Sequence, residues 1–103
     1  MRDQLRSSRC CKFLKALAEP DRLKIVQCLQ DGPKSVGAVA RALRTPVANA
    51  SHHLCLLKRA GLVSARKQGR YVMYTLAATV LRQRPSAPDV LDFGCCRIEL
   101  GPR

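Results

Sequence analysis

The chain has 103 residues, enough for one domain and too few for two independent hydrophobic cores. Hydrophobic residues make up 47% of it, but with two Phe, two Tyr and no Trp the core must be built from aliphatic side chains. The formal net charge of +12 favours a polyanionic partner, although charge alone does not distinguish DNA from RNA or an anionic membrane surface.

Two helices are expected in the first third of the chain, because apolar residues recur there at helical spacing. The first is predicted over residues 9–18, after a loose polar stretch at 1–8. Pro20 suits the first turn of a second helix, and the Asp-Gly-Pro run at 31–33 ends it.

Two further helices are expected between residues 35 and 60, with a short turn between them. Ser35 is a suitable N-cap for the third helix, and Thr45 is the predicted N-cap of the fourth, with Pro46 at its first helical position. The fourth helix is expected to run to about Ala60, where Gly61 supplies the left-handed residue that ends it. Its inward stripe consists of Ala50, Leu54 and Leu57.

A basic hairpin follows the fourth helix at once. Strands at 63–67 and 70–76 flank a tight Gln-Gly turn at 68–69. Two short helices followed by such a hairpin form the pattern of a winged helix-turn-helix, which on a basic chain indicates duplex DNA. The predicted fold class is therefore mainly α with a β-hairpin wing (α+β), and dimeric.

The remainder of the chain carries weaker signals. A short helix is predicted over 77–83, and two prolines break it. We therefore divide the chain into a winged helix-turn-helix DNA-binding domain at 1–84 and a cysteine-containing C-terminal tail at 85–103, which is either strand or irregular.

Three blocks stand in order along the chain: FLKALAEPDRLKIVQCL, SHHLCLLKRAGLV and RKQGRYVMYTL. They resemble the opening helix pair, the recognition helix and the wing of the arsenic- and metal-responsive winged-helix repressors, the ArsR/SmtB family. The resemblance covers about residues 12–77, and it is specific because all three blocks keep the family order and spacing. It implies a homodimeric repressor, packed through its first helix and a C-terminal helix, that leaves DNA when an inducer binds.

The N-terminal half of the fourth helix is predicted to read bases. Its solvent side carries Val47, Asn49, Ser51 and His52. Asn can pair bidentately with adenine, Ser and His can bond to several bases, and Val can contact a thymine methyl. The alternative is an ordinary solvated helix face on which the Asn and His side chains bond only locally.

Basic residues around these elements are predicted to contact the phosphate backbone or to act from the wing. They are Arg44, Lys58, Arg66, Lys67 and Arg70. A zinc site on the adjacent His52 and His53 is not expected, because neighbouring helix positions diverge by about 100°. We expect His53 to pack towards the turn or to contact a phosphate.

Neither a membrane partner nor a secretory route is expected. No apolar run approaches the roughly 18 residues that a membrane span needs. Arg2 and Arg6 are not followed by the continuous apolar stretch that a signal peptide requires. We therefore expect a cytoplasmic protein whose six cysteines are thiols rather than a disulfide framework.

Two adjacent cysteine pairs form a candidate inducer site, near opposite ends of the chain. They are Cys10, Cys11, Cys95 and Cys96. Such thiolates could pool around a thiophilic ion, with three sulfurs for As(III) or Sb(III), four for Cd or Zn and fewer for Cu(I). The alternatives are a redox-sensing disulfide between the two ends or two subunits, or simple packing. Cys28 is expected in the core and Cys55 partly buried.

Two metal sites that the resemblance would supply are missing. The third helix holds no cysteine, and the predicted C-terminal helix holds neither His nor paired carboxylates, so no cofactor is certain. An enzyme is not expected, since no nucleophile elbow or phosphate loop is present. A general nucleic-acid-binding or packaging protein with structural cysteines remains the rival. A repressor should prefer an imperfect palindrome over random duplex by about 10³-fold, whereas a packaging protein should not.

Overall fold

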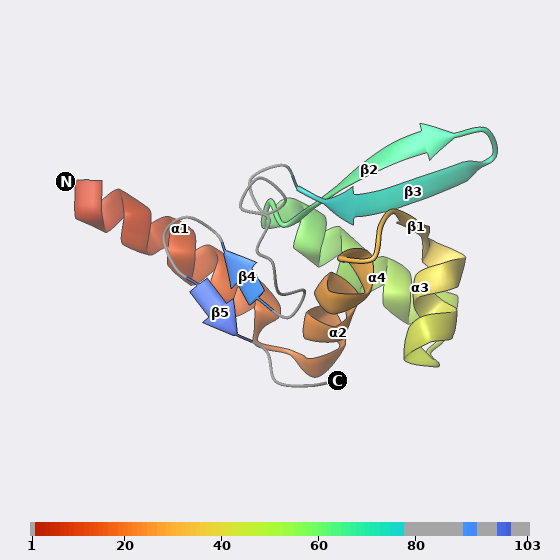
Figure 1. Cartoon of the computed structure of the whole chain (residues 1–103), viewed down its shortest axis with the longest axis horizontal. Helices are drawn as coiled ribbons and strands as arrows, with labels where there is room; N and C mark the ends of the chain where they lie inside the picture. Colours follow the sequence, from red (N-terminus) through yellow and green to blue (C-terminus); the bar gives the residue numbers. More distant parts are fainter. Residues whose placement is uncertain (1, 78–89, 93–96, 100–103) are drawn as a thin grey trace.

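The computed structural model of the chain describes residues 2–77, 90–92 and 97–99. Its elements in chain order are α1 (Arg2–Leu17), α2 (Pro20–Leu29), β1 (Lys34–Ser35), α3 (Val36–Leu43), α4 (Val47–Arg59), β2 (Val63–Gln68), β3 (Tyr71–Leu76), β4 (Val90–Asp92) and β5 (Arg97–Glu99). Helices α2, α3 and α4 pack together, the β2–β3 hairpin projects on one side, and α1 extends on the other (Figure 1). This arrangement confirms the predicted mainly α fold with a wing.

The first helix is longer than its sequence pattern predicted. Helix α1 begins at Arg2, so the expectation of a loose stretch at 1–8 was wrong. The sequence of its first turns lacks an apolar stripe, but Arg, Gln and Leu have high intrinsic helix propensity, which favours a helix there. Helix α2 begins at Pro20 as predicted, with Glu19 as its N-cap, and Ser35 caps α3 by accepting a hydrogen bond from the Ala38 N–H at 3.2 Å.

The turn between α3 and α4 differs from its prediction. Thr45 is not the N-cap of α4, because Pro46 occupies that position and makes no side-chain cap hydrogen bond. Arg44 ends α3 in the left-handed region at φ 56°, which sends the chain sharply towards α4. The Thr45 hydroxyl is used differently, since it accepts a hydrogen bond from Asn49 one turn into α4.

A three-stranded antiparallel sheet in the order β1-β3-β2 carries the wing. Strands β2 and β3 pair from Val63 opposite Leu76 to Gln68 opposite Tyr71, and the turn between them is one residue later than predicted, with Gly69 at φ 63°. Strand β1 was not predicted, because two residues are too short to show an alternating pattern.

The hydrophobic core lies where α4 meets α2, α3 and the base of the wing. Its fully buried large side chains are Ile25, Val26, Leu29, Val39, Leu54, Leu57 and Leu62. The predicted inward stripe of α4 is confirmed, since Ala50, Leu54 and Leu57 are all 0% exposed. All of these side chains are aliphatic, as the composition requires.

A short link joins α4 rigidly to the wing. Gly61 adopts φ 85°, as the predicted left-handed residue, and the chain enters β2 two residues later. Leu62 donates a backbone hydrogen bond to Leu57 in α4 and accepts one from Ala77 just after β3, at 3.0 and 2.8 Å. The end of the helix and the base of the wing are therefore fastened to the same residue.

The described part of the tail forms a small antiparallel pair, β4–β5, so the strand alternative was right for these residues. Ile98 of β5 packs against the core. The helix predicted at 77–83, the boundary between 84 and 85, and both Cys95 and Cys96 lie outside the described residues, apart from Ala77. No helix within the described residues is long and apolar enough to cross a membrane.

Candidate nucleic-acid interface

Helix α4 presents opposite surfaces to the core and to solvent. The four predicted base-reading residues are all exposed: Val47, Asn49, Ser51 and His52. Val47 is 52% exposed, a high value for an apolar side chain at the start of a helix. Short side chains on a helix of this kind leave room for the edges of bases in a major groove.

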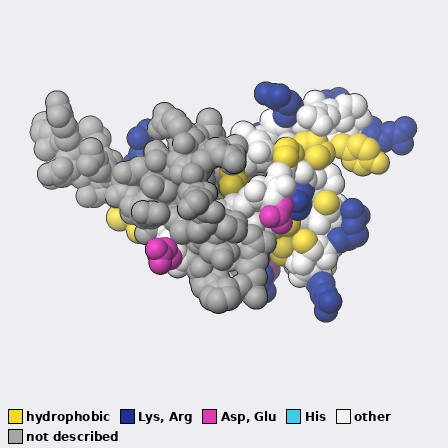
Figure 2. Space-filling model, in the orientation of Figure 1, with side chains coloured by type: hydrophobic (Ala, Val, Ile, Leu, Met, Phe, Trp, Pro, Cys, Tyr) yellow, Lys and Arg dark blue, Asp and Glu magenta, His cyan; other side chains and the backbone are white. Residues whose placement is uncertain are grey.

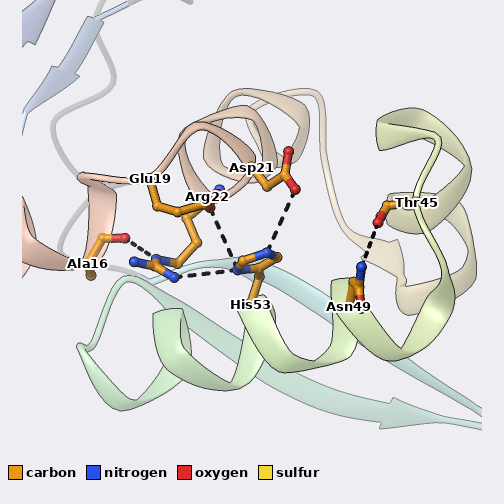
Figure 3. Close-up of polar contacts among 7 residues, drawn as sticks. All are labelled: Ala16, Glu19, Asp21, Arg22, Thr45, Asn49 and His53. Carbon is orange, nitrogen blue, oxygen red and sulfur yellow. Dashed lines mark hydrogen bonds and ion pairs between the residues drawn. The ribbon is translucent and has the colours of Figure 1, made fainter.

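Asn49 is partly engaged within the protein itself. Its amide donates to the Thr45 hydroxyl at 3.3 Å, and both side chains lie at the surface (Figure 3). An amide has two N–H donors and an acceptor oxygen. One donor and the oxygen therefore remain for a bidentate pair with adenine, so the local bond and the base-reading prediction are compatible.

The five basic residues predicted for the backbone and wing are all exposed. They are Arg44, Lys58, Arg66, Lys67 and Arg70. Lys and Arg side chains gather over the wing and along the edge formed by α3 (Figure 2). Among the described residues no carboxylate forms an ion pair with any of them. Their charge is therefore available to a polyanion.

His53 faces away from this surface, and the sequence pattern did not identify its partners. The ring lies between the carboxylates of Glu19 and Asp21, with Nδ1 and Nε2 each 3.7 Å from one of them (Figure 3). Arg22 of α2 lies 3.4 Å from Nδ1 and also donates to the carbonyl of Ala16. The alternative of a phosphate contact for His53 is disfavoured, because its side chain is only 16% exposed.

The pKa of the Glu19 carboxyl group is shifted by its neighbours in this cluster. Partial desolvation acts to raise its pKa, but hydrogen bonds from the Arg22 and Asp21 N–H groups, with the nearby His53 and Arg22, lower it below its ordinary value of 4.5. Glu19, Asp21 and His53 offer three ligand atoms within 4.8 Å of one another. A guanidinium nitrogen of Arg22 lies 3.4 Å from Nδ1 of His53, one of these atoms, so we interpret the cluster as a polar bridge between α2 and α4.

Comparisons with known proteins agree with this geometry. A helix-turn-helix domain family matches residues 17–65. The transcriptional repressor SdpR of Bacillus subtilis is 35% identical over 68 residues, covering 66% of this chain and 76% of that protein. The transcriptional activator HlyU of Vibrio cholerae is 38% identical over 76 residues, covering 74% of this chain and 70% of that protein.

The solved structures give the same result. HlyU from Vibrio cholerae superposes with a TM-score of 0.69 at 38% identity, covering 75% of this chain and 84% of that one. A homodimeric winged helix-turn-helix DNA-binding domain from Mycobacterium bovis, described as a possible ArsR-family transcriptional regulator, superposes with a TM-score of 0.68 at 36% identity, over 74% of this chain and 70% of that one. The chain belongs to the ArsR/SmtB family.

Family membership fixes the general activity of this ArsR/SmtB protein. It is a DNA-binding transcription regulator with a winged helix-turn-helix, and the resemblance carried by its three sequence blocks is confirmed. The relatives carry the names of regulators, which agrees with the absence of catalytic motifs from the sequence. The contacts of individual residues with DNA stay predictions.

The cysteines of this ArsR/SmtB protein are in two states. Cys10 in α1 is disulfide-bonded, so the expectation that all six cysteines are thiols was wrong for this residue, whereas Cys11, Cys28 and Cys55 form no disulfide. Cys11 and Cys55 are exposed and Cys28 is half-buried, so the expectation that Cys55 is partly buried was wrong. Position 55 follows the buried Leu54 on α4, and the turn of the helix carries it to the outer surface. A pooled thiolate site would need Cys10 reduced.

Proposed function

We propose that this regulator is a homodimeric repressor that binds an imperfect palindrome in duplex DNA and leaves it when Cys10 is oxidised to a disulfide. The observation that carries the proposal is the exposed row of short side chains on α4, mounted on a fully buried inner stripe beside a basic wing. Such a helix enters a major groove while the wing reaches the neighbouring backbone.

The proposed contacts divide the residues by chemistry. Val47, Asn49, Ser51 and His52 would face base edges. Arg44, Lys58, Arg66, Lys67 and Arg70 would neutralise phosphates or act from the wing. A dimer making about 6–10 phosphate contacts should lose orders of magnitude in affinity on modest salt addition.

The proposed dimer uses α1. Phe13 and Leu17 on this helix are buried in the core, but Leu14 is 44% exposed. An exposed leucine on a helix that extends from the body is suited to cover by a second copy, and the related Mycobacterium bovis domain is homodimeric. Two copies would set two α4 helices about one turn of DNA apart, which makes the preferred site a palindrome.

Thiol oxidation is the release mechanism that we favour over metal binding, because Cys10 lies in α1 and is disulfide-bonded. We propose that Cys95 or Cys96 supplies the second sulfur. Hydrogen peroxide would take two electrons and two protons from the two thiols, which would become the disulfide, and would itself be reduced to two waters. The bond would shift α1 against its partner and change the spacing of the two α4 helices, so that both could no longer dock.

Metal-dependent release is the second candidate. One relative is the cadmium resistance transcriptional regulatory protein CadC homolog of Staphylococcus aureus, 42% identical over 66 residues that cover 54% of it. Cys10, Cys11, Cys95 and Cys96 would together offer thiolates to Cd or Zn, As(III) or Sb(III), or Cu(I) once Cys10 is reduced.

The two mechanisms are separated by adjacent cysteine variants. Reduced protein bound to a DNA site selected from a random library is treated with hydrogen peroxide, or with Cd(II) or arsenite, and binding is followed by fluorescence anisotropy. Oxidative release should be lost in Cys10→Ser and kept in Cys11→Ser. Loss of metal-induced release in both variants, with no response to peroxide, would instead establish the pooled thiolate site.

Repression itself is tested by sequence preference and by transcription. The selected duplex should bind about 10³-fold more tightly than random duplex, and in a reconstituted transcription reaction it should silence an overlapping promoter. Equal affinity for both duplexes would favour a packaging protein.

A further inference from the structure

A groove lies between the wing and the first turns of α3, and of the DNA contacts proposed above only Arg70 lines it. It has a volume of about 660 Å³, and its walls include Ser35, Gly37, Arg41, Arg70, Tyr71 and Val72. None of the described residues that line it is acidic. Basic groups over α3 and the wing flank hydrophobic side chains along the underside of the wing (Figure 2).

Arg41 lines this groove from α3 and is exposed. It lies one turn after Gly37, and a Cβ added to that glycine would stand 3.6 Å from Nη1 of Arg41. The Ser35 hydroxyl is 3.9 Å from the same point. The guanidinium is therefore folded back over the start of the helix, and no carboxylate of the described residues forms an ion pair with it.

The opposite wall is an uncovered part of β3. Strand β1 pairs with β3 only at Met73 and Tyr74, so among the described residues no strand pairs on this side with the part of β3 nearer the wing tip. Tyr71 is 60% exposed and Val72 41% exposed, values that are high for their side chains. The groove thus combines two guanidinium groups with an apolar wall.

We propose that this groove holds a segment of the DNA sugar–phosphate backbone, with Arg41 and Arg70 on a phosphodiester and Tyr71 and Val72 against the deoxyribose. The proposal rests on the proposed function and adds a contact made by α3. Guanidinium groups bind phosphate oxygens through paired hydrogen bonds. A free inorganic phosphate would meet the two charges but leave the apolar wall uncovered.

The experiment compares Arg41→Gln with Lys24→Gln, which removes the same charge from an exposed position on α2. Both full-length proteins are titrated with the selected duplex at several salt concentrations, and circular dichroism confirms their folding. Arg41→Gln should weaken binding about tenfold and lower the slope of log affinity against log salt by about 0.9 for each lost phosphate contact. Arg41→Lys should restore the slope because it restores the charge.

The outcomes distinguish a failure of the groove contact from a failure of the proposed function. If no duplex is enriched by selection, the proposed function fails. If a duplex is enriched but Arg41→Gln and Lys24→Gln give equal slopes, the regulator stands and the groove contact is wrong. Saturable binding of inorganic phosphate that is lost in Arg41→Gln, with DNA affinity unchanged, would overturn the DNA occupant in favour of a small-anion site.

Discussion

The two surfaces of α4 differ in whether their residues pack on the core or are exposed to solvent. Ala50, Leu54 and Leu57 are 0% exposed and hold the helix on the core, whereas Val47, Asn49 and Ser51 on the outer surface contact little of the protein. Stability therefore depends on the inner surface, and we expect DNA affinity to depend on the outer one. This division is useful because each surface can be changed while the other is left intact.

The largest effect is expected from the inner surface. Leu54→Ala should lower the free energy of unfolding by about 2–5 kcal/mol, because it removes buried methyl groups and leaves a cavity. Urea denaturation followed by circular dichroism measures the change. Cys55→Ala is the matched control, since the next residue on the helix is exposed and should shift stability by no more than about 0.5 kcal/mol. Equal losses in both variants would contradict the division.

Asn49→Ala tests the outer surface. Affinity for the selected duplex should fall by about 1–3 kcal/mol while the urea midpoint stays unchanged, because a bidentate base contact is lost and nothing is unpacked. Thr45→Val removes the hydroxyl that accepts from Asn49 but leaves the amide in place. If the amide serves only the local bond, Thr45→Val and Asn49→Ala would weaken DNA binding equally.

Ser35→Ala extends the comparison to the helix that supports α4. Loss of the hydrogen bond from the Ala38 N–H should cost about 1 kcal/mol of folding stability. Because Ser35 also lines the groove proposed to hold the DNA backbone, the Kd for DNA of the folded protein should rise slightly, and by much less than in Arg41→Gln. A weakened Kd with unchanged thermal stability would show that the N-terminus of α3 acts on DNA directly.

The smallest effect is expected at the junction of the two surfaces, where Glu19 meets His53. The pKa of Glu19 is lowered in the folded chain, so its contribution to stability is present above its unfolded value near 4.5 and is lost as pH falls through the lower folded value. The difference in urea midpoint between the wild type and Glu19→Gln should therefore shrink below about pH 4.5. A constant difference from pH 7 to pH 3 would exclude an ionic role for this carboxylate.

Much of the fold could be predicted because it depends on local chemistry. The buried stripe of α4, the cap at Ser35 and the left-handed Gly61 each follow from residue type and spacing. Helix α1 was predicted too short because the sequence of its first turns has no apolar residues at helical spacing. Strand β1 was missed because its pairing with β3 depends on the tertiary arrangement.

The candidate interface was only partly predictable. The exposure of the predicted base-reading residues of α4 followed from the helix period, but their predicted DNA contacts depend on a partner molecule. The bridge from His53 to Glu19 and Asp21 joins residues far apart in sequence, so no short sequence motif predicts it. Arg41 was overlooked because its position beside the wing results from the packing of α3 against β3.

The short link at Gly61 determines how α4 and the wing would leave DNA relative to each other. Residues 60–62 alone separate α4 from β2, and Leu62 is hydrogen-bonded to Leu57 of α4 and to Ala77 just after β3, so we expect helix and wing to move together. A rotation that moves α4 out of a DNA groove would then also move the β2–β3 hairpin away from the neighbouring DNA backbone. If the proposed release occurs, we therefore expect the helix and the hairpin of each subunit to leave DNA together, without a populated form that keeps only its hairpin bound.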